Sequence, residues 1–128
     1  MEKAESFEKK VLLFGFEDLR SILAVKAALE PFDAELIPVA KTDYGKTLSE
    51  LAGLEEAPPL DDAKPVGGAI PERMAVLCGL DDELDALLPA LAGAGAGESL
   101  KAVLTRHNRT WSAARLYMEL SRERAALQ

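Results

Sequence analysis

Cysteine and histidine are nearly absent from this sequence, which has one of each, Cys78 and His107, among 128 residues. One cysteine cannot form a disulfide within the chain, and one cysteine with one histidine cannot complete a Cys/His zinc site. Aromatic residues are also scarce, at 5% of the chain, whereas hydrophobic residues reach 48%. The composition therefore predicts a globular core built mainly from Leu, Val, Ile and Ala, with no metal site and no cofactor.

Positive charge is in short supply, since 15 Lys and Arg residues face 22 Asp and Glu residues and leave a net charge of −7. Such a chain is repelled by nucleic acid phosphates and by anionic membrane surfaces, so we expect neither as a partner. No stretch approaches the ~20 apolar residues of a membrane span. The charged residues 1–10 also lack the apolar run of a signal peptide, which predicts a cytoplasmic protein.

Four short apolar runs are typical of strands. Residues 11–14 and 74–78 are continuously apolar and each run is followed by glycine, which favours central strands buried on both faces. The runs at 36–39 and 102–104 are weaker. Pro38 lacks the N–H donor that a central strand needs, so its strand is expected at an edge of the sheet.

A helical pattern follows each of these runs, at residues 19–29, 47–54, 84–91 and 113–127. Pro31 is expected to end the first helix, and Pro89 to kink the third. Asn108 is a suitable N-cap for the last helix. The glycine-rich residues 93–97 are expected to form a flexible connection.

The chain reads as one domain, residues 1–128, made of two halves at about 10–54 and 73–128. Residues 55–72 between them are rich in proline and glycine and show no apolar period. We expect a linker there, which could act as a lid over a nearby site.

The two halves resemble each other. The segment Val-Leu-Leu-Phe-Gly-Phe-Glu-Asp at 11–18 aligns with Ala-Val-Leu-Cys-Gly-Leu-Asp-Asp at 75–82, and Thr42-Asp43 aligns with His107-Asn108 at nearly the same shift. Alternating strands and helices predict an α/β three-layer sandwich. Its four-stranded, mostly parallel sheet is expected in the order 2-1-3-4, from two β-α-β-α halves. The relative direction of strands 1 and 3 stays open, because a twofold repeat would place them antiparallel.

Residues 72–80, 101–105 and the Asn-Arg-Thr-Trp segment at 108–111 resemble an uncharacterised bacterial family, domain of unknown function 3783. The resemblance covers about residues 72–124. It implies a bacterial, cytoplasmic protein, and it implies no activity.

Acidic pairs follow both central strands. If those strands are parallel, the pairs meet at the crevice where doubly wound sheets bind ligands, and they could hold Mg²⁺ or a small molecule. The alternative, which the pattern favours, is that acids at helix starts serve only as caps and dipole partners. The ligand-binding candidates in this crevice are Gly15, Glu17, Asp18, Gly79, Asp81 and Asp82.

Residues 40–47, Ala-Lys-Thr-Asp-Tyr-Gly-Lys-Thr, fit a relaxed phosphate-loop pattern between a strand and a helix. The first glycine of that pattern is missing, and bulky Tyr44 stands inside the loop. A simple turn that starts a helix is the favoured interpretation. The phosphate-binding hypothesis rests on Lys41, Gly45, Lys46 and Thr47.

Arg106, His107 and Arg109 form a second basic group, after strand 4, where they could bind a phosphate or carboxylate. The favoured alternative is that they keep an edge soluble and serve local ion pairs. Cys78, inside a central strand, is expected to be a buried and inert thiol. Trp111 is expected to be a packing aromatic near the start of the last helix.

No complete catalytic set is present, so a catalytic role is less favoured than a binding role. The sequence favours a non-enzymatic binding or protein-interaction module that self-associates as a homodimer. The alternative is a small-molecule site, for a phosphate-bearing ligand or Mg²⁺, at the carboxyl ends of strands 1 and 3 or at the Gly45-Lys46-Thr47 turn.

Overall fold

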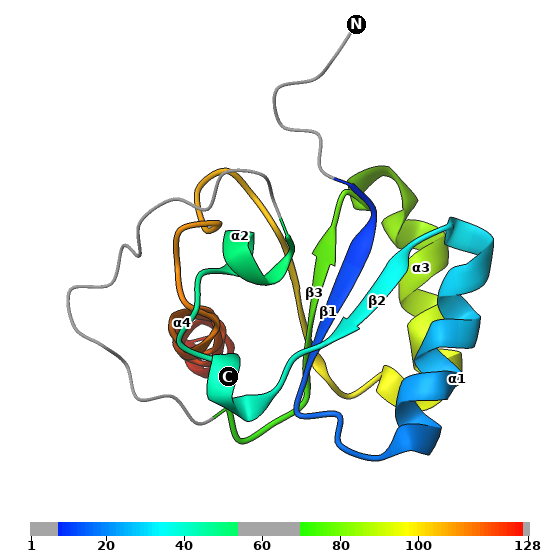
Figure 1. Ribbon diagram of the computed structural model, residues 1–128, viewed down its shortest axis with the longest axis horizontal. Coiled ribbons are helices and arrows are strands. Elements are labelled where there is room, and N and C mark those ends of the chain that lie inside the picture. Colours follow the sequence, from blue (N-terminus) through cyan, green and yellow to red (C-terminus); the bar gives the residue numbers. More distant parts are fainter. Residues whose placement is uncertain (1–7, 54–69, 127–128) are drawn as a thin grey trace, which may run out of the picture.

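The two apolar runs that precede glycine form the centre of a four-stranded sheet. The computed structural model describes residues 8–53 and 70–126, and its strands lie in the order β2-β1-β3-β4 (Figure 1). Strands β1 (Lys10–Phe14) and β3 (Met74–Cys78) are central, whereas β2 (Glu35–Pro38) and β4 (Leu100–Val103) are edges. The predicted order and the edge position of Pro38 are confirmed.

The central strands run in opposite directions. Strand β1 is parallel to β2 and β3 is parallel to β4, but β1 and β3 pair antiparallel. Leu12 faces Val76 in the middle of this pair, and Phe14 at the end of β1 faces Met74 at the start of β3. The sheet is therefore mixed, and the twofold alternative is the correct one.

Helices cover both faces, as a three-layer sandwich requires (Figure 1). Helices α1 (Leu19–Leu29) and α3 (Leu84–Leu91) pack on the side chains of Val11 and Leu13. Helices α2 (Leu48–Leu51) and α4 (Ala113–Ala126) pack on the other face, over Leu12 and Phe14. Because successive strand residues point to opposite faces, the continuous apolar runs supply both cores at once.

The structure corrects two local predictions. The chain at 93–97 is not a plain connection, because a π-helical turn (Ala92–Ala96) continues α3, with a kink inside it at Gly95, whose φ is 91°. Asn108 does not cap α4; Ser112 does, with its hydroxyl oxygen accepting the N–H of Arg115 at 3.1 Å. The Asn108 side chain instead closes the turn after β4, accepting from the Thr105 N–H and donating to the Val103 carbonyl.

The first and third helices keep their predicted places. Pro31 lies in a 3-10 turn (Glu30–Phe32) directly after α1, and another 3-10 turn (Asp81–Glu83) leads into α3. The interhalf linker predicted at 55–72, with its suggested lid, lies outside the described residues except for its last three. Of these, Ile70 is buried in the core beside β3.

Candidate ligand pockets around the turn after β1

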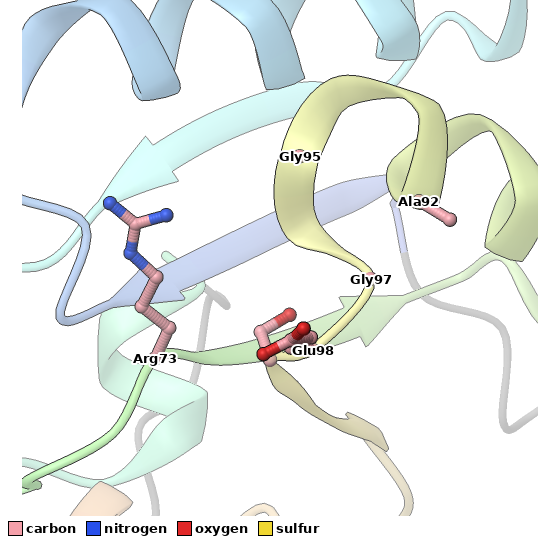
Figure 2. Close-up of a pocket in the computed structure, with 6 residues that line it drawn as sticks. Arg73, Ala92, Gly95, Gly97 and Glu98 are labelled. Carbon is pink, nitrogen blue, oxygen red and sulfur yellow. The ribbon is translucent and has the colours of Figure 1, made fainter.

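Arg73 connects the turn after β1 with the start of β3. Its guanidinium lies 2.9 Å from a carboxylate oxygen of Asp18 and 4.6 Å from the ring centre of Phe16. A pocket of about 480 Å³ opens beside Arg73, under the Gly95–Gly97 turn and next to Glu98 (Figure 2). This contact between Asp18 and Arg73 exists because β3 starts where β1 ends.

A second pocket lies at the carboxyl ends of the parallel strands β1 and β2, where α/β sheets usually bind ligands. Its volume is about 510 Å³. Lys41 and Glu17 stand at this pocket, with 2.8 Å between the ammonium nitrogen and the carboxylate oxygen. The hydrogen bond from Lys41 to Glu17 raises the pKa of Lys41 above its ordinary value. The lining residues are Gly15, Phe16, Glu17, Pro38, Val39, Ala40, Lys41 and Tyr44.

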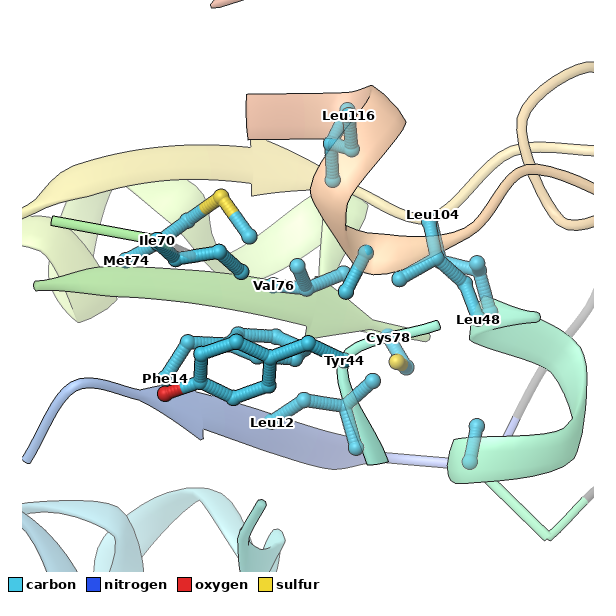
Figure 3. Close-up of a cluster of buried hydrophobic side chains, with 12 residues drawn as sticks. Leu12, Phe14, Tyr44, Leu48, Ile70, Met74, Val76, Cys78, Leu104 and Leu116 are labelled. Carbon is cyan, nitrogen blue, oxygen red and sulfur yellow. The ribbon is translucent and has the colours of Figure 1, made fainter. Parts of the chain in front are cut away.

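Tyr44 holds the two walls of this second pocket together. Its ring packs edge-on against Phe14, with 5.6 Å between the ring centres, inside the core over β1 (Figure 3). Its hydroxyl oxygen accepts the N–H of Gly15 at 3.0 Å. Gly15 has a φ of 82°, a backbone conformation that glycine adopts without strain. The pocket is thus built on a packed aromatic ring and one glycine with a positive φ.

The shared acidic crevice expected between β1 and β3 does not form. Because these strands are antiparallel, Gly15 and Gly79 follow opposite ends of the sheet. Asp18 accepts the N–H of Ser21 and thereby caps α1, and this hydrogen bond lowers the pKa of the Asp18 carboxyl. The prediction of a joint site was wrong in its geometry, since it assumed a parallel central pair. The separated groups are Gly15, Glu17 and Asp18 at one end, and Gly79, Asp81 and Asp82 at the other.

The Gly45-Lys46-Thr47 turn is engaged locally. Lys46 pairs with Asp43 at 3.2 Å, within the same turn. Thr47 caps the four-residue helix α2, its hydroxyl oxygen accepting the N–H of Glu50 at 3.0 Å. Of the phosphate-binding candidates here, Lys41 lines the pocket at β1 and β2, whereas the lining does not include Lys46 or Thr47.

The basic group after β4 lies at the edge and the end of the sheet opposite to the pocket at β1 and β2. His107 is exposed, and its ring packs edge-on against Trp111 at 5.3 Å between ring centres. Trp111 also lies under the guanidinium of Arg115, at 4.3 Å, which fits a packing aromatic. Arg109 contributes its main chain, accepting the N–H of Ser49 at 3.0 Å. Arg106 is exposed in the same turn.

Sequence reasoning missed Tyr44 and Arg73 as parts of these pockets. Tyr44 counted only as an obstacle to a phosphate loop, although a large aromatic residue inside a polar turn is itself a sign of packing. Arg73 precedes a buried strand, and its position beside Asp18 follows only from the antiparallel pairing.

The described residues form neither a metal-binding cluster nor a membrane-spanning helix. Within residues 8–53 and 70–126, no three His, Cys, Asp or Glu side chains gather closely enough to hold a metal ion. In the same part of the chain, no helix combines the length and the apolar character needed to cross a membrane.

Comparison with known proteins reaches only the second half of the fold. Residues 73–127 match the family model described as Domain of unknown function (DUF3783). No curated protein and no solved structure matches the chain significantly. The matched segment begins just before β3 and covers α3, β4 and α4. The resemblance predicted for about 72–124 is confirmed by this match at residues 73–127, and the family's description assigns no activity.

Proposed function

We propose that this protein is a non-enzymatic interaction module that self-associates through the outer face of α1. The family resemblance also supports a bacterial, cytoplasmic protein. The observation that carries the proposal is a pair of exposed leucines: Leu19 is 68% exposed and Leu23, one helical turn later, is 52% exposed. Residues four apart share one helix face, so these two apolar side chains lie next to each other on the outer face of α1.

A second copy of this chain suits the surface. A groove of about 420 Å³ runs beside Leu23, between α1 and β2, and it contains Lys26 together with Glu30 and Glu35. A twofold dimer places the same patch of both subunits face to face. Lys26 of one subunit can then lie opposite an acid of the other, so the patch is complementary to itself in charge.

The edge of β2 contributes little to such an interface. Glu35 and Val39 direct their backbone N–H groups toward β1. The backbone nitrogens of Leu36 and Pro38 therefore lie on the outer edge of the sheet. Proline has no N–H, so this short edge offers few donors for an added strand. Contact through helix side chains is the better-supported mode.

The self-association test compares charged substitutions on opposite layers. We expect Leu19→Glu combined with Leu23→Glu to convert a dimer into a monomer. Light scattering after gel filtration at about 100 µM measures this, because a dimer with a Kd of about 1 µM is largely associated at that concentration. The matched control is Met118→Glu on α4, because Met118 is 49% exposed on the other layer. A wild-type monomer at this concentration, or a double variant with unchanged mass, refutes the proposal.

The environment of the thiol argues against one catalytic group, a nucleophilic Cys78. Cys78 is 1% exposed, and its burial raises the pKa of the thiol to about 12. A reactive thiolate needs the opposite environment.

A small-molecule site is the second candidate, favoured by the opposite charges of Lys41 and Glu17 at the pocket between β1 and β2. Adjacent opposite charges over an apolar floor suit a zwitterion, such as an amino acid, better than a bare phosphate. The test is thermal unfolding with amino acids, phosphate, ATP and Mg²⁺. A ligand at 100 times its Kd stabilises the protein by about 2.7 kcal/mol. Lys41→Ala should abolish the shift and Lys46→Ala should not; no shift, or a shift that survives Lys41→Ala, excludes the site.

A further inference from the structure

The two halves of the chain are related by a twofold axis through the sheet. The repeat aligns Leu12 with Val76, 64 positions later, and these two equivalent residues face each other in the β1–β3 pair. When a residue pairs with its own equivalent in an antiparallel ladder, a twofold axis passes through that pair.

Hydrogen bonds on the α2–α4 face obey the same symmetry. Ser49 donates its N–H to the carbonyl of Arg109 at 3.0 Å, and Ala114 donates its N–H to the carbonyl of Tyr44 at 3.2 Å. A shift of 65 positions converts each bond into the other. Thr47 and Ser112 form an antiparallel bridge between these bonds.

The equivalent residues also do the same local work. The Thr47 hydroxyl oxygen caps α2 by accepting the N–H of Glu50, and the Ser112 hydroxyl oxygen caps α4 by accepting the N–H of Arg115. Each half therefore presents one surface that the other half complements in backbone pairing and in side-chain packing. Such a surface has the form of a homodimer interface.

We propose that the contact between the two halves is a dimer interface enclosed in one molecule. Two copies of the chain can then form the same contact between them by exchanging halves. In the exchanged dimer, residues 8–53 of one chain pair with residues 70–126 of the other, through the same contacts. The tether between the halves decides which form prevails. Joining two binding surfaces in one chain can give an effective concentration in the millimolar range, so we expect the closed monomer to prevail below it.

The tether has to span the length of β1. Lys10, at the start of β1, donates to the carbonyl of Ala52 at 2.6 Å. Glu72 and Arg73 lie beside Gly15, just after the end of β1. Five residues of strand cover about 16 Å. Deleting residues 54–69 leaves three Cα steps from Gly53 to Glu72, at most about 11 Å, which is shorter than β1, so we expect the deletion to exclude the closed monomer.

The experiment detects the exchange through cysteines placed at the Thr47–Ser112 bridge. Thr47→Cys and Ser112→Cys are placed in separate chains, each carrying the deletion of residues 54–69 and Cys78→Ala, which removes the native thiol. The two chains are mixed, refolded together and oxidised. We expect a disulfide between the chains, seen as a covalent dimer on a non-reducing gel, because a bridge position brings the two Cα atoms within disulfide range. Circular dichroism checks that the dimer is folded.

Three controls decide the outcome. Each single-cysteine chain alone should give no covalent dimer, since a thiol introduced at either bridge position then faces only a hydroxyl. The double substitution in the undeleted chain should form its disulfide internally. A mixture of undeleted single-cysteine chains, refolded at millimolar concentration, repeats the test without the deletion.

Two results overturn the proposal. One is the lack of a cross-link in both mixtures. The other is cross-linking of the Ser112→Cys chain alone, which shows that like halves pair. Adding Leu19→Glu and Leu23→Glu leaves the cross-link intact, which separates exchange from association through α1.

Discussion

Gly15→Ala probes the place where the antiparallel sheet brings distant segments together. Gly15 has a φ of 82°. A Cβ there would lie 3.1 Å from the carbonyl oxygen of Glu72 and 3.3 Å from the Cα of Arg73, both backbone atoms that cannot move freely. Only the antiparallel course of β3 places these residues beside Gly15.

The expected loss has two opposing parts. An L side chain in left-handed backbone costs about 1–2 kcal/mol. Replacing glycine also restricts the unfolded chain, which returns about 0.4–1 kcal/mol. The tight backbone contacts add to the cost, so we expect a net destabilisation of roughly 1–3 kcal/mol.

Gly45→Ala is the matched control. Gly45 has no positive φ, and a Cβ there would meet no atom within 4 Å. We expect a change between zero and about 1 kcal/mol of stabilisation, because only the unfolded chain is affected. Urea unfolding of the wild type and both variants measures the difference. A neutral Gly15→Ala, or a Gly45→Ala as damaging as Gly15→Ala, would refute the reasoning.

Three further predictions concern single contacts. Glu72 accepts hydrogen bonds from Arg124 and Tyr117, and the bond from Arg124, followed by that from Tyr117, lowers the pKa of the Glu72 carboxyl below its ordinary 4.5. The stabilisation from these bonds is therefore fully present above pH 4.5. It is lost as the pH falls through the lowered pKa of Glu72 in the folded protein. Thermal unfolding should therefore show Glu72→Gln less stable than the wild type at pH 7 and equally stable at low pH. Cys78 should resist thiol reagents at pH 8 in the native protein and react once it is unfolded. Asn108→Ala should cost about 1–3 kcal/mol in urea unfolding, because its amide closes a buried turn.

The strand order was predictable because strands buried on both faces have apolar residues at every position. The runs at 11–14 and 74–78 are apolar at every position, so both faces had to be covered. Pro38 excluded its strand from the centre. Strand direction could not be predicted, because the same apolar pattern is compatible with a parallel or an antiparallel pair. A repeat of 64 positions is likewise compatible with halves related by translation or by a twofold rotation.

The candidate site was predictable in part. Gly15, Glu17 and Lys41 were singled out from the ends of strands, and all three line the pocket at β1 and β2. Asp81 and Asp82 were assigned to the same place only through the assumed parallel pair. Which residues lie opposite the end of β1 is a long-range property that composition and local spacing do not encode.

The N-cap of α4 could not be predicted from the local sequence alone. Asn108 and Ser112 are both suitable N-caps four positions apart, and local propensity does not separate them. The choice is made by tertiary structure, because the Thr47–Ser112 bridge fixes where α4 begins. The Asn108 side chain then closes the preceding turn.

The twofold arrangement of the halves is tested most directly by the neighbours of Gly15 in nuclear Overhauser spectra. We predict contacts between the α-protons of Gly15 and protons of Arg73, with none to Gly79. Contacts from Gly15 to Gly79, without contacts to Arg73, would mean parallel central strands and would contradict the account.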